Sequence, residues 1–395
     1  MPPRVALIST IRHNVGDDLV REGILSLLED LLGPCDAAVI HKHVPATARP
    51  GWEWIHTSGL TKAFDLLPRG KANLLSRIVD VLPYDERTDR VLSADLLVQC
   101  GTPAYYCFRN GYGAHRNEWF RPLVAARHAR IRARVPFLNV GAGSCQPYGD
   151  DGTAILRNGA CAAYVRALQE SARLTTVRDA LARDVLRRFG WDAPLLACPS
   201  IFARDRAGIR PAPPGPAVLN FMPRGGHYDL WVGIDLRRWE GEFRAFAQEA
   251  ARDRAVLLAC HDAAEMRAAA RLLPGLPRRL VRDWREALAL YAAASCYLGS
   301  RVHGACAVAS FGRPAFLVGN DSRALTLDEL GVPRAFVQTA TRDALAEALH
   351  RMEHEPPDAA ARREALRNDT RRRYRELLAP VLAAAGLRGG GGRAA

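Results

Sequence analysis

The chain has 395 residues, 48% of them hydrophobic and 25% charged, which is long enough to fill two globular cores. It carries 55 Lys and Arg against 42 Asp and Glu, giving a formal net charge of +13, but no aromatic-studded basic strand or nucleic-acid recognition motif accompanies that charge. The composition therefore argues against nucleic acid as a partner and is compatible with an anionic substrate or peripheral contact with an acidic membrane.

Two features predict a cytoplasmic protein. No apolar run approaches the ~18 residues of a membrane span, and the apolar segment at residues 5–8 is shorter than the core of a signal peptide. The nine cysteines are odd in number, scattered and never spaced as CxxC. We therefore expect reduced thiols rather than a disulfide framework or a zinc site.

Strand-like and helix-like segments alternate in the first half of the chain, which predicts a parallel sheet covered on both faces. A run of four prolines at residues 210–216 predicts a linker, and the alternation restarts after it. The expected strands are residues 5–9, 37–40, 94–99, 135–140, 175–177, 195–197, 217–221, 255–259, 296–299 and 314–318. The expected helices are residues 18–32, 180–189, 238–251, 263–272, 284–294, 304–311 and an Arg-rich segment at 357–385.

The predicted fold class is α/β, with two Rossmann-like, doubly wound parallel-sheet lobes and a cleft between them, an arrangement of the GT-B type. The predicted divisions are an N-terminal lobe that binds the acceptor (1–209), the linker (210–216), a C-terminal lobe that holds the donor site (217–350), a helix that packs back on the lobes (351–388) and a flexible tail (389–395).

Ligands of open parallel sheets gather beyond the carboxyl ends of the strands, so polar residues in the turns that follow the strands are the candidates for a binding site. The first such turn contains Asn14, Gly16 and Asp17. Asn14 and Asp17 suit sugar hydroxyls, and an ordinary helix N-cap explains them equally well. The turn at 99–103, with Gly101 and Thr102, and the turn at 141–144 expose backbone, but neither has the spacing of a phosphate-binding loop.

The sharpest turn is residues 299–306, where Arg301 and His303 alternate between a strand and a helix of small residues. A guanidinium can fork onto a phosphate or carboxylate, and a neighbouring imidazole can carry a proton near neutral pH. The alternative is that Arg301 pairs with a buried Asp while His303 caps the helix. Arg178 occupies a similar strand-to-helix turn, with Asp179 and Asp184 as its alternative partners.

These motifs, in this order, resemble the polysaccharide pyruvyltransferase family over about residues 5–331. The segment Ser300–Ala305, followed by the glycine-proline turn at 311–314, resembles the family's S-R-x-H helix start and is the most specific match. Segments 14–17, 94–101 and 171–186 resemble its N-x-G-D turn, its strand before a glycine-rich turn and its arginine-bearing segment. The chain departs from the family at residues 100–103, which lack successive glycines, and at Cys198-Pro199, where many members have Asp-Pro.

The resemblance implies transfer of an enolpyruvyl unit from phosphoenolpyruvate to a glycan or other polyhydroxylated acceptor, which is closed as a ketal. It implies that Arg178 and Arg301 bind the donor and that His303 is the general acid. Phosphoenolpyruvate is a co-substrate in this scheme, and neither a cofactor nor a metal is required. Contacts to the acceptor are expected from Asn14, Asp17, Gly101, Thr102 and His261. The candidate for the base is Asp17, or else His261 together with Asp262.

Two other functions fit the same lobes. A nucleotide-sugar glycosyltransferase would need an acidic residue for the ribose, and Asp321 or Asp328 could supply it. A non-catalytic relative in polysaccharide assembly is the second alternative, which the retention of Arg178, Arg301 and His303 disfavours.

Overall fold

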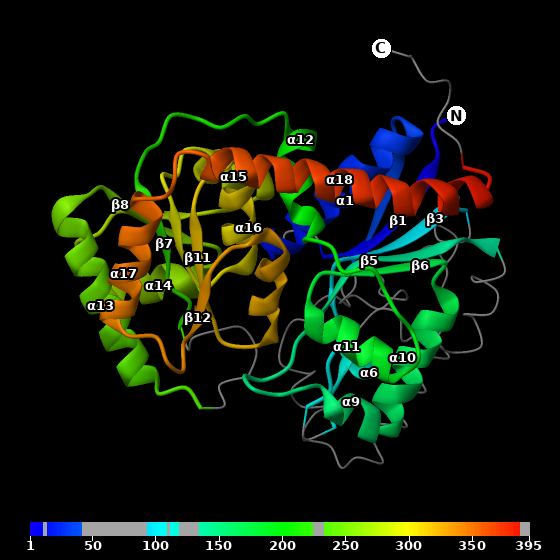
Figure 1. The fold of residues 1–395 in the computed structure, drawn as a ribbon, viewed down its shortest axis with the longest axis horizontal. Coiled ribbons are helices and arrows are strands. Elements are labelled where there is room, and N and C mark those ends of the chain that lie inside the picture. Colours follow the sequence, from blue (N-terminus) through cyan, green and yellow to red (C-terminus); the bar gives the residue numbers. More distant parts are fainter. Residues whose placement is uncertain (11–13, 42–92, 109–110, 118–133, 224–232, 388–395) are drawn as a thin grey trace, which may run out of the picture.

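The computed structural model describes residues 1–10, 14–41, 93–108, 111–117, 134–223 and 233–387. Within these ranges the chain forms two parallel β-sheets with helices packed on them, so the predicted α/β class is confirmed (Figure 1). Residues 210–216 adopt neither helix nor strand, as their prolines predicted. The predicted tail at 389–395 lies outside the described residues.

The first sheet places β2, β1, β3 and β5 side by side, with both β4 and β6 bonded to β5. Strands β3 and β5 are buried along their whole length, as expected for parallel strands covered on both faces. The strands are β1 (Arg4–Ser9), β2 (Asp36–His41), β3 (Leu96–Cys100), β4 (Pro103–Tyr105), β5 (Phe137–Ser144) and β6 (Leu174–Val177). The helices of this half are α1 (Val15–Leu32), α6 (Ala114–Asn117), α9 (Thr153–Arg157), α10 (Gly159–Ser171), α11 (Ala180–Arg188), the 3₁₀ helix η1 (Pro199–Phe202) and α12 (Ala203–Ala207).

The second sheet has the order β12-β11-β10-β7-β8-β9, which is the strand order of dinucleotide-binding folds. Its strands are β7 (Ala217–Asn220), β8 (Val256–Cys260), β9 (Arg278–Leu280), β10 (Tyr297–Gly299), β11 (Ala315–Gly319) and β12 (Arg334–Phe336). Its helices are α13 (Leu236–Asp253), α14 (Ala263–Leu272), α15 (Trp284–Ala292), α16 (Val302–Ser310), the 3₁₀ helix η3 (Ser322–Leu330) and α17 (Arg342–Glu353).

Two predicted elements of the first half are wrong. Residues 141–144 are the second half of β5 rather than a turn, and they pair with β4 on one side and β6 on the other. Gly141 has a φ of +67° at the point where the pairing of β5 with β6 changes register. A glycine is therefore favoured there because the strand kinks at this residue. The strand predicted at 195–197 is reduced to one bridge between Leu195 and Val177.

The prediction that every cysteine is reduced is also wrong, because Cys107 and Cys161 form a disulfide with their Cα atoms 6.3 Å apart. The two residues are 54 positions apart in the sequence, and short spacing motifs such as CxxC detect no pair of this kind. The cysteine argument for a cytoplasmic location therefore no longer stands. Separately, none of the helices in the described ranges is long and apolar enough to cross a membrane.

The C-terminal helix α18 (Ala359–Ala384) packs against α1, β6, α16 and η3. In Figure 1 it is the red helix that runs along the top of both sheets. Arg371 pairs with Asp30 at 2.6 Å and with Asp205 at 2.7 Å, and Tyr374 donates to the carbonyl of Ala197 at 3.1 Å. Part of the arginine excess of this helix is therefore used in internal ion pairs.

One apolar core joins the two sheets. It contains Leu7 and Val98 of the first sheet, Leu317 of the second, and Tyr374 of α18, all fully buried. Helix α1 contacts α15 and α16 directly, so the two halves meet through packed side chains. This shared core holds the two sheets together, and the site described next lies beyond the carboxyl ends of their strands.

Candidate functional site

A cleft lies where residues after the strands of both sheets come together. The space between its walls, open solvent at the mouth included, is about 730 Å³. The polar side chains that line it come from five strand-to-helix connections, consistent with a site beyond the carboxyl ends of parallel strands. They are Asn14, Asp17, Arg178, His261, Ser300, Arg301, His303, Asn320, Asp321 and Arg323.

Arg178 follows β6 and is 3% exposed. Its Nη1 atom lies 3.4 Å from Nε2 of His303, and its buried Nε has no hydrogen-bond partner among the described residues. Asp179 is used elsewhere, because its carboxylate accepts from the backbone N–H of Ala182 and of Ser144, at 2.8 Å each, as the N-cap of α11. Within the part of the chain that is described, no ion pair joins Arg178 to a carboxylate, so an anion in the cleft can use this guanidinium.

Arg301 is placed differently, because carboxylates already hold it. Its Nε donates to buried Glu265 at 2.5 Å, and its Nη2 donates to Asp262 at 2.6 Å. Burial raises the pKa of Glu265, although the charge of Arg301 opposes that rise. The alternative that Arg301 pairs with a buried acidic group is therefore the geometry found, with a Glu in place of the expected Asp. Asp262 is 41% exposed, and it is the partner that an incoming anion can displace.

His303 lies in the first turn of α16, which begins at Val302, two residues earlier than predicted. The N-cap of this helix is Arg301, which makes no side-chain cap hydrogen bond, so the alternative role of His303 as the cap is not found. The imidazole lies against Gly16, where an added Cβ would overlap its Nδ1 atom. The glycine of the N-x-G-D turn thus makes room for the histidine of the S-R-x-H segment, two motifs that the fold brings into contact.

Cys198 lies beneath this pair and was not predicted as a site residue. Its sulfur accepts from Nη1 of Arg178 at 3.8 Å and from the hydroxyl of Ser200 at 3.3 Å. Burial opposes ionisation of this thiol, but hydrogen bonds with Cys306 and His303 and the charge of Arg178 outweigh it, so its pKa lies well below the ordinary value. The one signal in the sequence was the departure at Cys198-Pro199, which places a sulfur where an acid was expected.

His261 follows β8 and lines the cleft. Its Nε2 lies 2.5 Å from the hydroxyl of Tyr291, while its buried Nδ1 has no partner among the described residues. Burial, together with the charges of Arg301 and His303, holds the pKa of His261 well below its ordinary value. The imidazole is therefore neutral near pH 7, the form that can accept a proton.

Asn14 and Asp17 also line the cleft, beside the start of α1. Asn14 is the N-cap, since its side chain accepts from the backbone N–H of Gly16 at 3.0 Å. Asp17 accepts from the hydroxyl of Thr10 at 3.0 Å. Both therefore have the helix-start role of the alternative interpretation while still facing the cleft.

Gly101 and Thr102, the other two predicted acceptor contacts, are not among the residues that line this cleft. Gly101 has a φ of +46° and packs against Val20, and Thr102 is buried and accepts from the side chain of Gln99 at 3.1 Å. Their neighbour Pro103 reaches the cleft instead. These geometries point to a packing role for both residues.

The acidic residues named for a glycosyltransferase are both engaged. Asp321 is the N-cap of η3 and accepts from the Nε of Arg323 at 2.8 Å and from its Nη2 at 2.5 Å. Asp328, within the same 3₁₀ helix, pairs with Arg334. Of the three arginines that line the cleft, Arg301 and Arg323 are held by carboxylates, while Arg178 pairs with none in the described ranges.

Comparison with known proteins gives a family and a fold. A family model described as polysaccharide pyruvyl transferase matches residues 14–322, and no curated protein sequence matches the chain. Among solved structures, UDP-GlcNAc 2-epimerase of Neisseria meningitidis, bound to UDP-GlcNAc, is similar at 10% identity and a TM-score of 0.51, over 96% of this chain and 100% of that one. UDP-GlcNAc 2-epimerase of Methanocaldococcus jannaschii is similar at 12% identity and a TM-score of 0.51, over 89% and 93%. These structures confirm the predicted two-lobed fold of the GT-B type.

Proposed function

Because the chain belongs to the polysaccharide pyruvyl transferase family, we propose that it transfers the enolpyruvyl unit of phosphoenolpyruvate to a hydroxylated glycan and closes it as a pyruvate ketal. The observation that carries this proposal is the contact of Arg178 with His303 in the cleft, 3.4 Å apart and without a carboxylate partner for Arg178 among the described residues. A cation beside a proton carrier suits a small anion that must be protonated on carbon.

Arg178 is the primary donor ligand in this proposal. Its guanidinium pairs with the phosphate or carboxylate of phosphoenolpyruvate, and the N-terminus of α16 adds backbone N–H groups on the same side. Arg301 joins when the anion displaces Asp262, while Glu265 keeps its hold on Nε. Donor binding thus replaces Asp262 with an anionic group of the donor at Arg301 and adds a new partner at Arg178.

His303 supplies the proton. A guanidinium only donates, so its contact with Nε2 makes that nitrogen an acceptor in the free protein. In the proposed step a proton from solvent passes through His303 to the methylene carbon of phosphoenolpyruvate, and the C2–C3 π pair forms the new C–H bond. The resulting tertiary cation at C2 is attacked by an acceptor hydroxyl.

Phosphate then leaves C2 with the C–O bonding pair, and a second hydroxyl of the acceptor closes the ring. Two hydroxyl protons are released: that of the attacking hydroxyl passes to its base and from it to the departing phosphate, and that of the ring-closing hydroxyl restores His303. His261, held neutral and with Nδ1 unpartnered among the described residues, is the base we assign to the attacking hydroxyl. Asp17 is the alternative base, and no cofactor or metal is needed for these steps.

The decisive experiment is calorimetric titration of the protein with phosphoenolpyruvate, with UDP-sugars and GDP-sugars in parallel. We expect phosphoenolpyruvate to bind, and we expect Arg178→Ala to abolish that binding and Arg301→Ala to weaken it. Binding of a nucleotide sugar alone would establish the glycosyltransferase alternative. A donor that binds without turnover on any glycan tested would instead favour the non-catalytic relative.

A further inference from the structure

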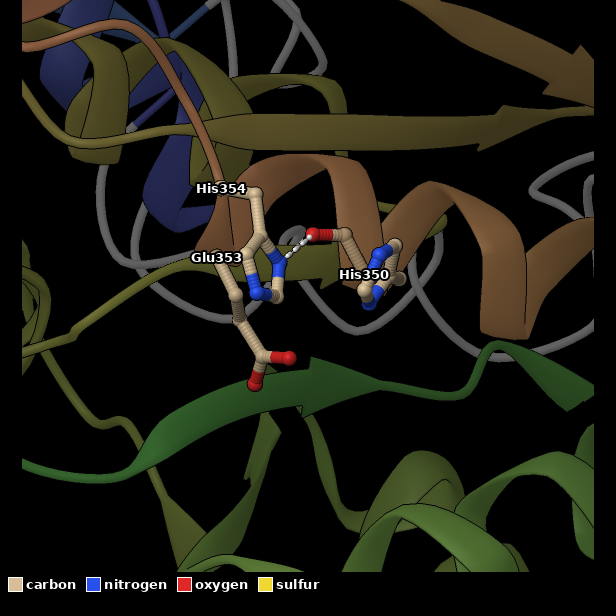
Figure 2. Close-up of side chains that lie close together, drawn as sticks. All are labelled: His350, Glu353 and His354. Atoms are coloured by element: carbon tan, nitrogen blue, oxygen red, sulfur yellow. Dashed lines mark hydrogen bonds between the residues drawn. The ribbon is translucent and has the colours of Figure 1, made fainter.

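Three exposed side chains at the end of α17 form a cluster of metal-ligating groups that is separate from the cleft. They are His350, Glu353 and His354, in the order His-x-x-Glu-His. One nitrogen of each imidazole and a carboxylate oxygen of Glu353 all lie within 4.8 Å of one another. Figure 2 shows the two imidazoles side by side, with the carboxylate next to His354.

The hydrogen bonding of His354 prepares it as a ligand. Its Nδ1 lies 2.8 Å from the backbone carbonyl of His350, and a carbonyl only accepts, so Nδ1 carries the proton (Figure 2). Nε2 therefore keeps the lone pair. Histidines that bind metals commonly have this arrangement, in which a backbone carbonyl holds one nitrogen and the metal takes the other.

The charge around the cluster also favours a cation. His350 and Glu353 lie in the last turn of α17, where the carbonyl ends of the helix carry a partial negative charge. The two imidazole rings are 4.1 Å apart between centroids. Arg254 opposes a metal ion, because its Nη1 pairs with Glu353 at 2.8 Å.

We propose that His350, Glu353 and His354 bind one divalent transition-metal ion of the class that prefers imidazole, such as Zn²⁺. Two imidazoles and one carboxylate are a usual ligand set for zinc, and water completes the coordination. All three side chains are exposed, so they can turn to bring their ligand atoms to about 2.0–2.2 Å from the ion. Glu353 leaves Arg254 when the metal binds.

The test is titration of the tag-free, full-length protein with Zn²⁺, followed by calorimetry, with circular dichroism to verify folding of each variant. We expect one site, and we expect His350→Ala or His354→Ala to weaken binding by more than about tenfold, since loss even of a neighbour that orients a ligand costs that much. Arg254→Ala should strengthen binding, because it removes the cation that competes for Glu353.

Two controls make the result specific. Cys35→Ser tests the free thiol that is not fully buried, and its affinity for Zn²⁺ should equal that of the wild type. Unchanged binding in the His350→Ala/His354→Ala double variant, or a wild type that takes up no Zn²⁺ at 100-fold excess, would overturn the proposal. If the two histidines alone bound the metal, neither Arg254→Ala nor Glu353→Gln would change the affinity for Zn²⁺. That result would show that Glu353 is not a ligand.

Discussion

At the scale of single residues, the two histidines of the cleft have different surroundings. His303 lies beside Arg178 and above Cys198, where hydrogen bonds and charge lower the pKa of the thiol. His261 lies beside Arg301 and the hydroxyl of Tyr291, where burial keeps the imidazole neutral. Two titratable groups in environments of this kind suit an acid and a base of one reaction.

His303→Ala should lower kcat by about 10² to 10⁴-fold, the usual contribution of general acid catalysis, while the Kd for phosphoenolpyruvate changes much less. The physical reason is that in the proposed reaction His303 delivers a proton, whereas Arg178 holds the charge of the donor. Steady-state kinetics and calorimetry on the same preparation measure both quantities. A large loss of donor affinity with unchanged turnover would refute the role of His303 as the acid.

Arg301→Ala should lower the free energy of unfolding by about 3 kcal/mol, because it leaves the buried carboxylate of Glu265 without its partner. Urea denaturation measures this loss. Arg178→Ala is the matched control, since no ion pair joins Arg178 to a carboxylate among the described residues and buried Asp179, on which its charge acts, keeps two backbone N–H donors. Its effect on stability should be smaller than its effect on donor binding. Equal losses of stability in the two variants would contradict the different placements of the two arginines.

His261 should make the protein less stable in mild acid. Its pKa in the folded state is depressed, so the unfolded chain binds the proton more readily, and stability present above pH 6.5 is lost as the pH falls. Between pH 7.5 and pH 5.5 the loss from this residue should be about 1.4 kcal/mol, given an ordinary histidine pKa of about 6.5. The measurement is urea unfolding of wild type and His261→Gln at both pH values. Equal pH dependence in the two proteins would show that His261 is not held neutral.

At the scale of secondary-structure elements, the site depends on how closely α1 approaches α16. Gly16 in the first turn of α1 leaves the space that the ring of His303 fills. The topology of the two sheets alone would bring the two helices to the same cleft. The absence of a Cβ atom at Gly16 then determines how near the ring of His303 lies to the start of α1. The small residue is therefore part of the site although it has no chemistry of its own.

Gly16→Ala should displace the imidazole of His303 and lower kcat, with little change in the midpoint of thermal unfolding, because the side chain of His303 can turn away. Gly241→Ala is the matched control: Gly241 is also helical, nothing lies within 4 Å of the Cβ it would gain, and this variant should gain about 0.5–1 kcal/mol of stability with unchanged turnover. Full activity of Gly16→Ala would show that the position of the ring is not critical.

At the scale of the whole molecule, the two sheets share one apolar core, and α18 packs on both halves. Polar contacts reinforce the junction at the edge of the cleft: the hydroxyl of Ser322 in η3 lies 2.7 Å from that of Ser144 in β5 and accepts from the backbone of Gln146 at 2.8 Å. An interface of this kind, apolar and crossed by packed helices, favours a fixed relation between the lobes.

We expect a single cooperative unfolding transition for this reason. Differential scanning calorimetry, with fluorescence and circular dichroism on the same sample, should give coincident midpoints. Tyr374→Ala, which empties a fully buried position where α18 meets the core, should lower that single midpoint. Two separated transitions, of which only one responds to Tyr374→Ala, would show that the halves fold independently.

The sequence by itself determined the alternation of strands and helices, the break in regular structure at residues 210–216 and the turns that carry Arg178, His261 and His303. These features depend on local patterns of apolar spacing, proline and polar residues after strands, which operate over a few positions. The predicted strands missed β4, β9 and β12, each of three residues. Of these, β9 and β12 are edge strands that are partly exposed and carry no apolar pattern.

Only the tertiary structure decided which groups meet. The carboxylates of Asp262 and Glu265 hold Arg301 from 39 and 36 positions away, Cys198 lies under His303, and the disulfide closes across 54 positions. Partners at such separations leave no periodic signal in the chain, because their pairing results from the packing of whole elements rather than from the residues around each of them. For the same reason the sequence could not distinguish Arg178 from Arg301, two arginines at similar turns. Carboxylates hold Arg301, whereas Arg178 faces the cleft beside His303.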